Sequence, residues 1–205
     1  MEFKDVIERR RTIRDFKSNP IPENVIMYAI ENAFKALTYN HMRDWDFILA
    51  DTIDAKGKFI ESENLEKEIN LSELEKIFEN EDEEKKDMYL DAIPKQKRMI
   101  LSAPVVIIAI YKPKTTVKYA QKVYDLNCLA SIWCAIENLL LSLAEHDVQG
   151  VTFIPQHTEK IKSRFNIPQD REVAAVIPIG YKSENAKIVK QKIINIPERL
   201  HRNLW

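Results

Sequence analysis

The residues best suited to do chemistry lie near the start of the chain, where residues 9–16 read Arg-Arg-Arg-Thr-Ile-Arg-Asp-Phe. If this segment runs extended, alternate side chains share a face. One face then carries Arg10, Thr12 and Arg14, whereas Arg11 points the other way. Two guanidinium groups beside a hydroxyl can hold phosphate oxygens through paired hydrogen bonds. The run therefore predicts a phosphate-binding site, with a solvated basic helix end as the simpler interpretation.

Composition bounds the class of protein. A chain of 205 residues with 45% hydrophobic content suits one compact domain with a sizeable core. The sequence pI of about 6.5 argues against a dedicated nucleic-acid binder, for which a strongly basic domain is expected. Charge is unevenly spread, because residues 54–98 carry a net charge of −5 and residues 182–205 a net charge of +4. A basic tail and a basic N-terminal run would suit one shared anion site.

Several signals favour a cytoplasmic protein that needs neither a membrane nor a metal. Cys128 and Cys134 lie six positions apart in a helical pattern, so they cannot easily pair within one helix, which fits a reducing compartment. The N-terminus has no apolar signal core, and the longest apolar run, residues 103–111, is too short to span a bilayer. The histidines show no ligand spacing, so no metal site is predicted.

The elements that must position the basic run follow from hydrophobic periodicity. A short helix is expected to end near Arg9. Residues 116–146 form the longest helical pattern, and because it is apolar almost all round from Leu126 to Leu143, it is expected to be a core helix. A β-branched apolar run indicates a strand buried on both faces at residues 104–111. The other predicted elements are a helix from about Pro22, strands at residues 45–50, 151–154 and 172–181, and a helix at residues 159–165. This mixture predicts an α+β fold with a mixed central β-sheet flanked by helices.

Two segments stand apart from this single predicted domain of residues 1–205. Residues 54–98 are highly charged with helical periodicity, and we expect solvated helices that cover one edge of the fold. The arm formed by residues 182–205 has few helix or strand signals, yet it ends in Leu204 and Trp205. Because a free tail rarely carries such apolar residues, the arm is expected to dock on a partner subunit.

The order and spacing of these motifs resemble the nitroreductase family of FMN-dependent oxidoreductases over nearly the whole chain. Residues 10–16 match the family pattern R-R-S-x-R-x-F, and residues 36–45 correspond to A-P-S-S-x-N-x-Q-P-W. Residues 148–150 read as the family's Val-Gln-Gly turn, and residues 176–181 as V-I-P-I-G-Y. The resemblance implies a nitroreductase-like homodimer with an extended C-terminal arm.

The resemblance also implies an FMN site. Residues at both ends of the chain would contact the phosphate, the ribityl chain and the pyrimidine edge: Arg10, Arg11, Thr12, Arg14, Lys190 and Lys192. Arg98 would lie near flavin N1 and O2, where a fixed cation stabilises the negative charge left by hydride transfer. Two loops would approach the ring, one of them from the other subunit: Thr38, Tyr39 and His41 from the partner, and Ile154, Pro155 and Gln156.

The implied activity is ping-pong transfer of hydride from NAD(P)H through FMN to a small-molecule acceptor such as a nitro compound or a quinone. The cofactor carries this chemistry, so no protein acid or base is assigned. The sequence departs from the family pattern at His41, Arg43, Asp44 and residues 155–156. These departures motivate an alternative, a non-catalytic or specialised flavin-binding protein of the same fold. A nucleic-acid binder that uses residues 9–14 is a third hypothesis, which the overall charge balance opposes.

Overall fold

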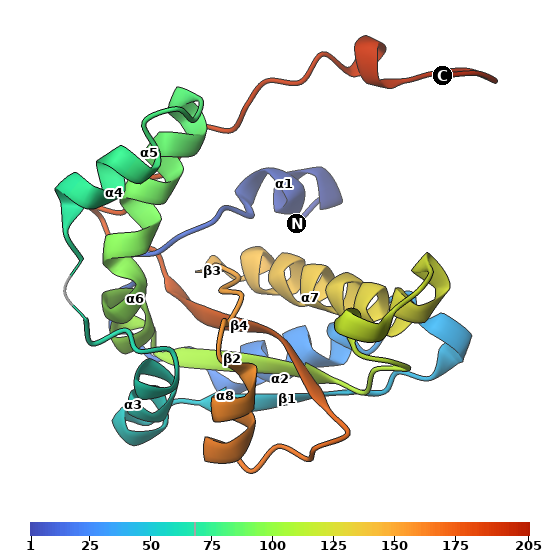
Figure 1. Cartoon of the computed structure of the whole chain (residues 1–205), viewed down its shortest axis with the longest axis horizontal. Helices are drawn as coiled ribbons and strands as arrows, with labels where there is room; N and C mark the ends of the chain where they lie inside the picture. The colour runs from blue at the N-terminus through green and yellow to red at the C-terminus, as the bar shows by residue number, and fades with distance from the viewer. Residues whose placement is uncertain (68) are drawn as a thin grey trace.

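A four-stranded sheet forms the centre of the molecule, which Figure 1 shows as a computed structural model. The structure describes residues 1–67 and 69–205, so Glu68 of the charged stretch lies outside the described residues. The strands are β1 (Trp45–Ala50), β2 (Val105–Tyr111), β3 (Val148–Gly150) and β4 (Glu172–Tyr181). Their order is β1-β2-β4-β3, and every neighbouring pair is antiparallel. A mixed sheet was predicted, but among the described residues the parallel pairing is limited to an isolated bridge from Thr12 to Gly150.

Helices cover both faces of this sheet, which confirms the predicted α+β class. The first half of the chain contributes α1 (Phe3–Arg9), α2 (Glu23–Ala33), α3 (Ile53–Ser62) and α4 (Leu71–Ile77). The second half contributes α5 (Glu83–Ala92), α6 (Gln96–Ser102), α7 (Asn127–Glu145) and α8 (Thr158–Arg164). Most of the described residues of the charged stretch, 54–67 and 69–98, lie in helices as expected, and α4, α5 and α6 lie together at one end of the sheet (Figure 1).

The two faces of β2 hold two separate cores. Ile107 and Ala109 pack with α2 and α7, whereas Ile108 and Ile110 pack with α3, α6 and α8. The division follows from the pleat, because successive side chains of a strand point to opposite faces. A strand that is buried on both faces reads as a continuous apolar run, and all seven residues of β2 are buried.

Helix α7 is shorter than the helical pattern predicted. The expected span of residues 116–146 narrows to Asn127–Glu145, and two short 3-10 turns, Val117–Tyr119 and Val123–Leu126, precede it. Val123 is 83% exposed, so no packed apolar face supports a regular helix in these turns. By length and composition, residues 123–145 could cross a membrane, and in this fold α7 is a core helix packed on α2 and the sheet.

The strand predicted at residues 151–154 lies earlier in the chain than expected. The third strand to pair with the sheet is β3 at Val148–Gly150, and Phe153 makes only an isolated bridge to Val176. Gln149 belongs to this edge strand, where its backbone pairs with Gly180. Its side-chain oxygen accepts a hydrogen bond from the backbone N–H of Arg11 in the N-terminal run. Beyond β4, the arm extends past α1 and away from the sheet (Figure 1).

Candidate functional site

The N-terminal basic run lies across the sheet edge and is held by its apolar members. Ile13 is fully buried, and its N–H donates to the carbonyl of Gly150 at 3.2 Å. Three residues later Phe16 is buried and bridges Lys182 at the end of β4. These anchors fix the backbone of the run, so the polar residues between them occupy defined positions.

Gly180 makes this crossing possible. A Cβ atom at that position would lie 2.7 Å from Cδ of Pro104 and 3.1 Å from Cδ1 of Phe16. Any larger residue would therefore push the run away from β4. The glycine of the predicted I-G-Y ending has a packing role that the sequence pattern alone does not reveal.

The run and the C-terminal arm together line one cavity of about 360 Å³. We call it the basic cavity. Most of its basic and hydroxyl-bearing residues come from the two ends of the chain. They are five of the six residues predicted to contact the phosphate, the ribityl chain and the pyrimidine edge: Arg11, Thr12, Arg14, Lys190 and Lys192. The first turns of α5 close the cavity with Asp82, Glu84, Lys85 and Met88. Residues more than 170 positions apart thus converge on a space that suits a phosphate group.

The strict alternation expected for the run is not kept. Arg10 lies outside the basic cavity, and its Nε atom is 3.7 Å from a carboxylate oxygen of Glu137 on α7. Arg11 lines the basic cavity although it was expected on the opposite face. Its N–H donates to the side-chain oxygen of Gln149 at 2.9 Å, which fixes the backbone there. A side chain as long as arginine can then reach around the extended backbone of the run to the basic cavity.

A second cavity, of about 340 Å³, adjoins the first. We call it the apolar cavity, because most of its wall comes from apolar and aromatic side chains: Met88, Tyr89, Ile93, Met99, Phe153 and Ile154. Polar and charged side chains complete the wall: Arg14, Glu63, Gln96, Thr152, Gln156 and His157. Arg14 and Met88 belong to the walls of both cavities, so Arg14 stands where the basic and apolar spaces meet.

The loop after β3 is held against the apolar cavity by Glu63. This carboxylate is buried, and it accepts hydrogen bonds from the backbone N–H groups of Gln156 and His157, both at 2.8 Å. Pro155 is buried in the loop, whereas Ile154 and Gln156 line the cavity. Sequence reasoning missed Glu63, because nothing distinguishes it from the other acidic residues of the charged stretch.

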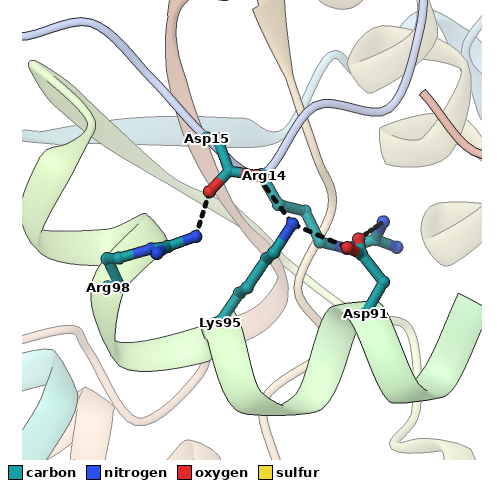
Figure 2. Close-up of polar contacts among 5 residues, drawn as sticks. All are labelled: Arg14, Asp15, Asp91, Lys95 and Arg98. Atoms are coloured by element: carbon teal, nitrogen blue, oxygen red, sulfur yellow. Dashed lines mark hydrogen bonds and ion pairs between the residues drawn. The ribbon is translucent and has the colours of Figure 1, made fainter. Parts of the chain in front are cut away.

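An alternating chain of charges joins the basic run to α5 and α6 (Figure 2). Nη1 of Arg14 lies 3.5 Å from Asp91, and Nζ of Lys95 lies 2.6 Å from Asp91 and 2.7 Å from Asp15. Arg98 ends the chain at Asp15.

The surroundings of this cluster shift the pKa values of two of its cations. Burial lowers the pKa of the Arg14 guanidinium, although the nearby negative charges of Asp91 and Asp15 act in the opposite direction. Burial also disfavours charged Lys95, but its two hydrogen bonds outweigh burial and raise the pKa of the ammonium.

Arg98 does not line either cavity. Its side chain is 65% exposed and borders a separate surface hollow with Pro94 and Leu101, while its guanidinium is bound to Asp15. The cation that the structure places at the wall of the apolar cavity is Arg14.

The loop predicted to serve the partner's flavin lies at the far end of α7 from the basic run. The N–H of Tyr39 donates to the hydroxyl of Ser131 at 2.8 Å, near the start of that helix. From there to Glu145 the helix rises roughly 20 Å. Thr38, Tyr39 and His41 therefore do not reach the cavities of their own chain.

This loop has an unusual backbone. Asn40, His41 and Arg43 have φ angles of 48°, 54° and 46°, in the left-handed region that residues other than glycine seldom adopt. The Arg43 side chain donates to the carbonyl of Phe34 at 2.9 Å, which holds the turn in place.

Comparison with known proteins gives a consistent result. The sequence model described as the nitroreductase family matches residues 7–181. Iodotyrosine deiodinase 1 of Rattus norvegicus is 28% identical over 209 residues, covering 95% of this chain and 67% of that protein. Iodotyrosine deiodinase of Thermotoga neapolitana is 22% identical over 178 residues, covering 86% of this chain and 87% of that protein.

Solved structures share the fold. The crystal structure of oxidized iodotyrosine deiodinase bound to FMN and 3-iodo-L-tyrosine has a TM-score of 0.74 at 18% identity and covers 100% of both chains. A BluB-like flavoprotein from Clostridium difficile 630 has the same TM-score and identity and covers 98% of this chain and 99% of that chain. At these identities the likeness establishes the architecture.

Proposed function

The chain belongs to the nitroreductase family, and from that membership we propose that it is an FMN-dependent oxidoreductase that passes hydride from NAD(P)H to a small-molecule acceptor. The basic cavity carries this proposal. Arg11, Thr12 and Arg14 meet Lys190 and Lys192 there, and this set of guanidinium, hydroxyl and ammonium donors suits the phosphate monoester of FMN.

The apolar cavity supports the second half of the proposal. The aromatic, methionine and aliphatic side chains of its wall suit the faces of a planar ring system, and the cavity begins where the basic cavity ends. Bound FMN supplies reversible two-electron hydride chemistry. The protein's own contribution is to bind the phosphate, to orient the ring and to place Arg14 beside it. A cation there favours the negative charge that reduction leaves on the flavin.

The relatives suggest which acceptors to test first. The curated relatives described above are named iodotyrosine deiodinases, and one related structure holds 3-iodo-L-tyrosine. We therefore extend the proposal from nitro compounds and quinones to halogenated tyrosines. Tyr89 and Met88 on α5 line the apolar cavity, so the charged stretch that contains α5 is positioned to influence acceptor choice.

The alternative, a flavin-binding protein without turnover, rests on the departures from the family pattern. Asp44 is engaged by Arg171 at 2.5 Å, and Arg43 holds the carbonyl of Phe34, so neither side chain is free to reach a ligand in this conformation. Turnover distinguishes the two proposals, because a protein that binds FMN but oxidises no NADH or NADPH with any acceptor class would support the alternative.

The first test is a titration of the protein with FMN, in which flavin fluorescence and absorbance measure binding. We expect Lys192→Gln to weaken binding by roughly ten- to 150-fold, because a charged hydrogen bond to phosphate is worth roughly 1.5–3 kcal/mol. Lys187→Gln removes the same charge from the same arm outside the basic cavity, and it should leave affinity within about twofold. A wild-type protein that binds no FMN at micromolar concentrations would contradict the proposal. Anaerobic addition of NADH or NADPH, followed by each acceptor, then measures turnover.

A further inference from the structure

We propose that Asp91 on α5 is a positioning residue of the flavin site, which acts through Arg14 and sets the net charge beside the flavin. This inference rests on the proposed function, because it takes Arg14 to be the cation next to bound FMN. It assigns a specific role to a residue of the charged stretch that no sequence motif singled out.

The geometry around Asp91 points to this role. Its side chain is 7% exposed and that of Arg14 is 10% exposed, so solvent screens their interaction little. One carboxylate oxygen of Asp91 lies 3.5 Å from Arg14, and the other lies 2.6 Å from Lys95 (Figure 2). A buried carboxylate shared between two cations fixes both of them more firmly than a surface pair would.

The same chain of contacts ties the flavin site to two helices. Asp91 lies near the end of α5, whose residues wall both cavities, and Lys95 lies just before α6. Lys95 passes the connection on to Asp15, the neighbour of Arg14 in the basic run. Arg14 is therefore held on one side through Asp91 and on the other through the backbone next to Asp15, which leaves its guanidinium at the junction of the cavities.

The charges in this cluster predict whether loss of the Asp91 charge favours reduced or oxidised FMN, and this direction can be tested. Arg14, Lys95 and Arg98 oppose Asp15 and Asp91, so the five side chains shown in Figure 2 carry a net charge of +1. Loss of the Asp91 charge would raise this to +2 within a poorly screened site. Because reduced flavin is anionic, the added positive charge should favour reduced over oxidised FMN.

A purely structural ion pair predicts something different. Such a pair would change the free energy of unfolding without changing the relative affinity of the two flavin states. The midpoint potential of bound FMN therefore separates the two roles. It differs from that of free FMN in proportion to the logarithm of the dissociation constant of oxidised FMN divided by that of reduced FMN.

The experiment compares Asp91→Asn with Asp87→Asn in the FMN-loaded, full-length protein. Asp87 lies one turn earlier on the same helix and is exposed, so its variant makes the same charge change in solvent. We expect Asp91→Asn to raise the ratio of the two dissociation constants about tenfold, equivalent to about 30 mV for a two-electron couple. Asp87→Asn should change it less than twofold. Equal shifts in the two variants, or no shift in either, would overturn the role of Asp91.

A second variant covers the case in which Asp91→Asn does not fold. Lys95→Gln keeps the Arg14–Asp91 pair and removes one positive charge from the cluster, so it should lower the midpoint potential. A raised or unchanged potential in Lys95→Gln would contradict the inference even if the Asp91 variant cannot be purified. Failure of the wild-type protein to bind FMN would instead contradict the proposed function, so the two failures can be told apart.

Discussion

Buried charged side chains hold backbone segments in this protein. Nζ of Lys56 donates to the carbonyl of Ala103 at 2.5 Å, at the end of α6, and burial lowers the pKa of this ammonium. Glu63 accepts two backbone hydrogen bonds from the loop at the apolar cavity. In both cases a charge removed from water is matched by backbone dipoles, which is the condition under which such burial is tolerated.

Glu63→Gln should destabilise the protein by about 1–3 kcal/mol, because an amide offers one acceptor oxygen where the carboxylate offers two, leaving one partly buried N–H unpaired. Urea denaturation of the apoprotein measures this loss. Glu61→Gln is the matched control in the last turn of α3, two residues before Glu63, since Glu61 pairs with Arg164 at the surface and should contribute less than about 1 kcal/mol. Similar losses in the two variants would show that Glu63 does not anchor the loop as described.

At the scale of elements, the site depends on the crossing of the basic run over β4. The run has no regular secondary structure, yet Ile13 and Phe16 are buried against the sheet and its backbone bonds to neighbouring strands. Helices α5 and α6 face it across the charge chain (Figure 2). The basic run, β4 and the α5–α6 pair therefore hold one another in position. At the crossing, Gly180 of β4 lets the backbone of the run come close to the strand.

Gly180→Ala should destabilise the protein by about 1–3 kcal/mol, since its Cβ would overlap Pro104 and the overpacked crossing must open. Because Phe16 carries the run, we also expect weaker FMN binding in this variant. Gly57→Ala is the matched control, because a Cβ at that position of α3 meets nothing within 4 Å. That change should stabilise the protein by about 0.5–1 kcal/mol. Thermal unfolding of both variants, with and without FMN, checks the contrast.

At the scale of the whole molecule, we propose that two chains complete each flavin site. The loop of residues 38–41 lies at the opposite end of α7 from its own cavities, and the arm extends from the body with large apolar side chains exposed. Ile193 is 85% exposed, Leu204 83% and Trp205 fully. Such residues are expected to be covered by a partner subunit in solution.

Deletion of residues 193–205 leaves the two predicted phosphate ligands of the arm in place and removes these apolar side chains. We expect the shortened protein to dissociate to monomers and to lose affinity for FMN, because the partner's loop is then missing. Light scattering and flavin fluorescence measure the two effects. Ile53→Ala, which removes a similarly exposed side chain from α3, should change neither. A full-length, FMN-loaded monomer would contradict the shared site.

Much of the fold could be predicted from local sequence. The strands β1 and β4 match the predicted ranges, and β2 begins one residue later than its apolar run suggested. Strong periodicity marks such elements because each side chain's burial follows from its place in the pleat. The α7 boundary and the position of β3 were predicted less well, since both depend on which residues find a packing partner.

The sequence by itself determined the family, the α+β class and the presence of a basic run near the N-terminus, because local periodicity and motif order carry that information. Only the tertiary structure decided which residues meet. It brought Lys190 and Lys192 to Arg11, paired Arg14 with Asp91 and set Arg98 aside on Asp15. These are contacts between segments distant in sequence, and they are settled by packing and by the cost of burying unpaired charge.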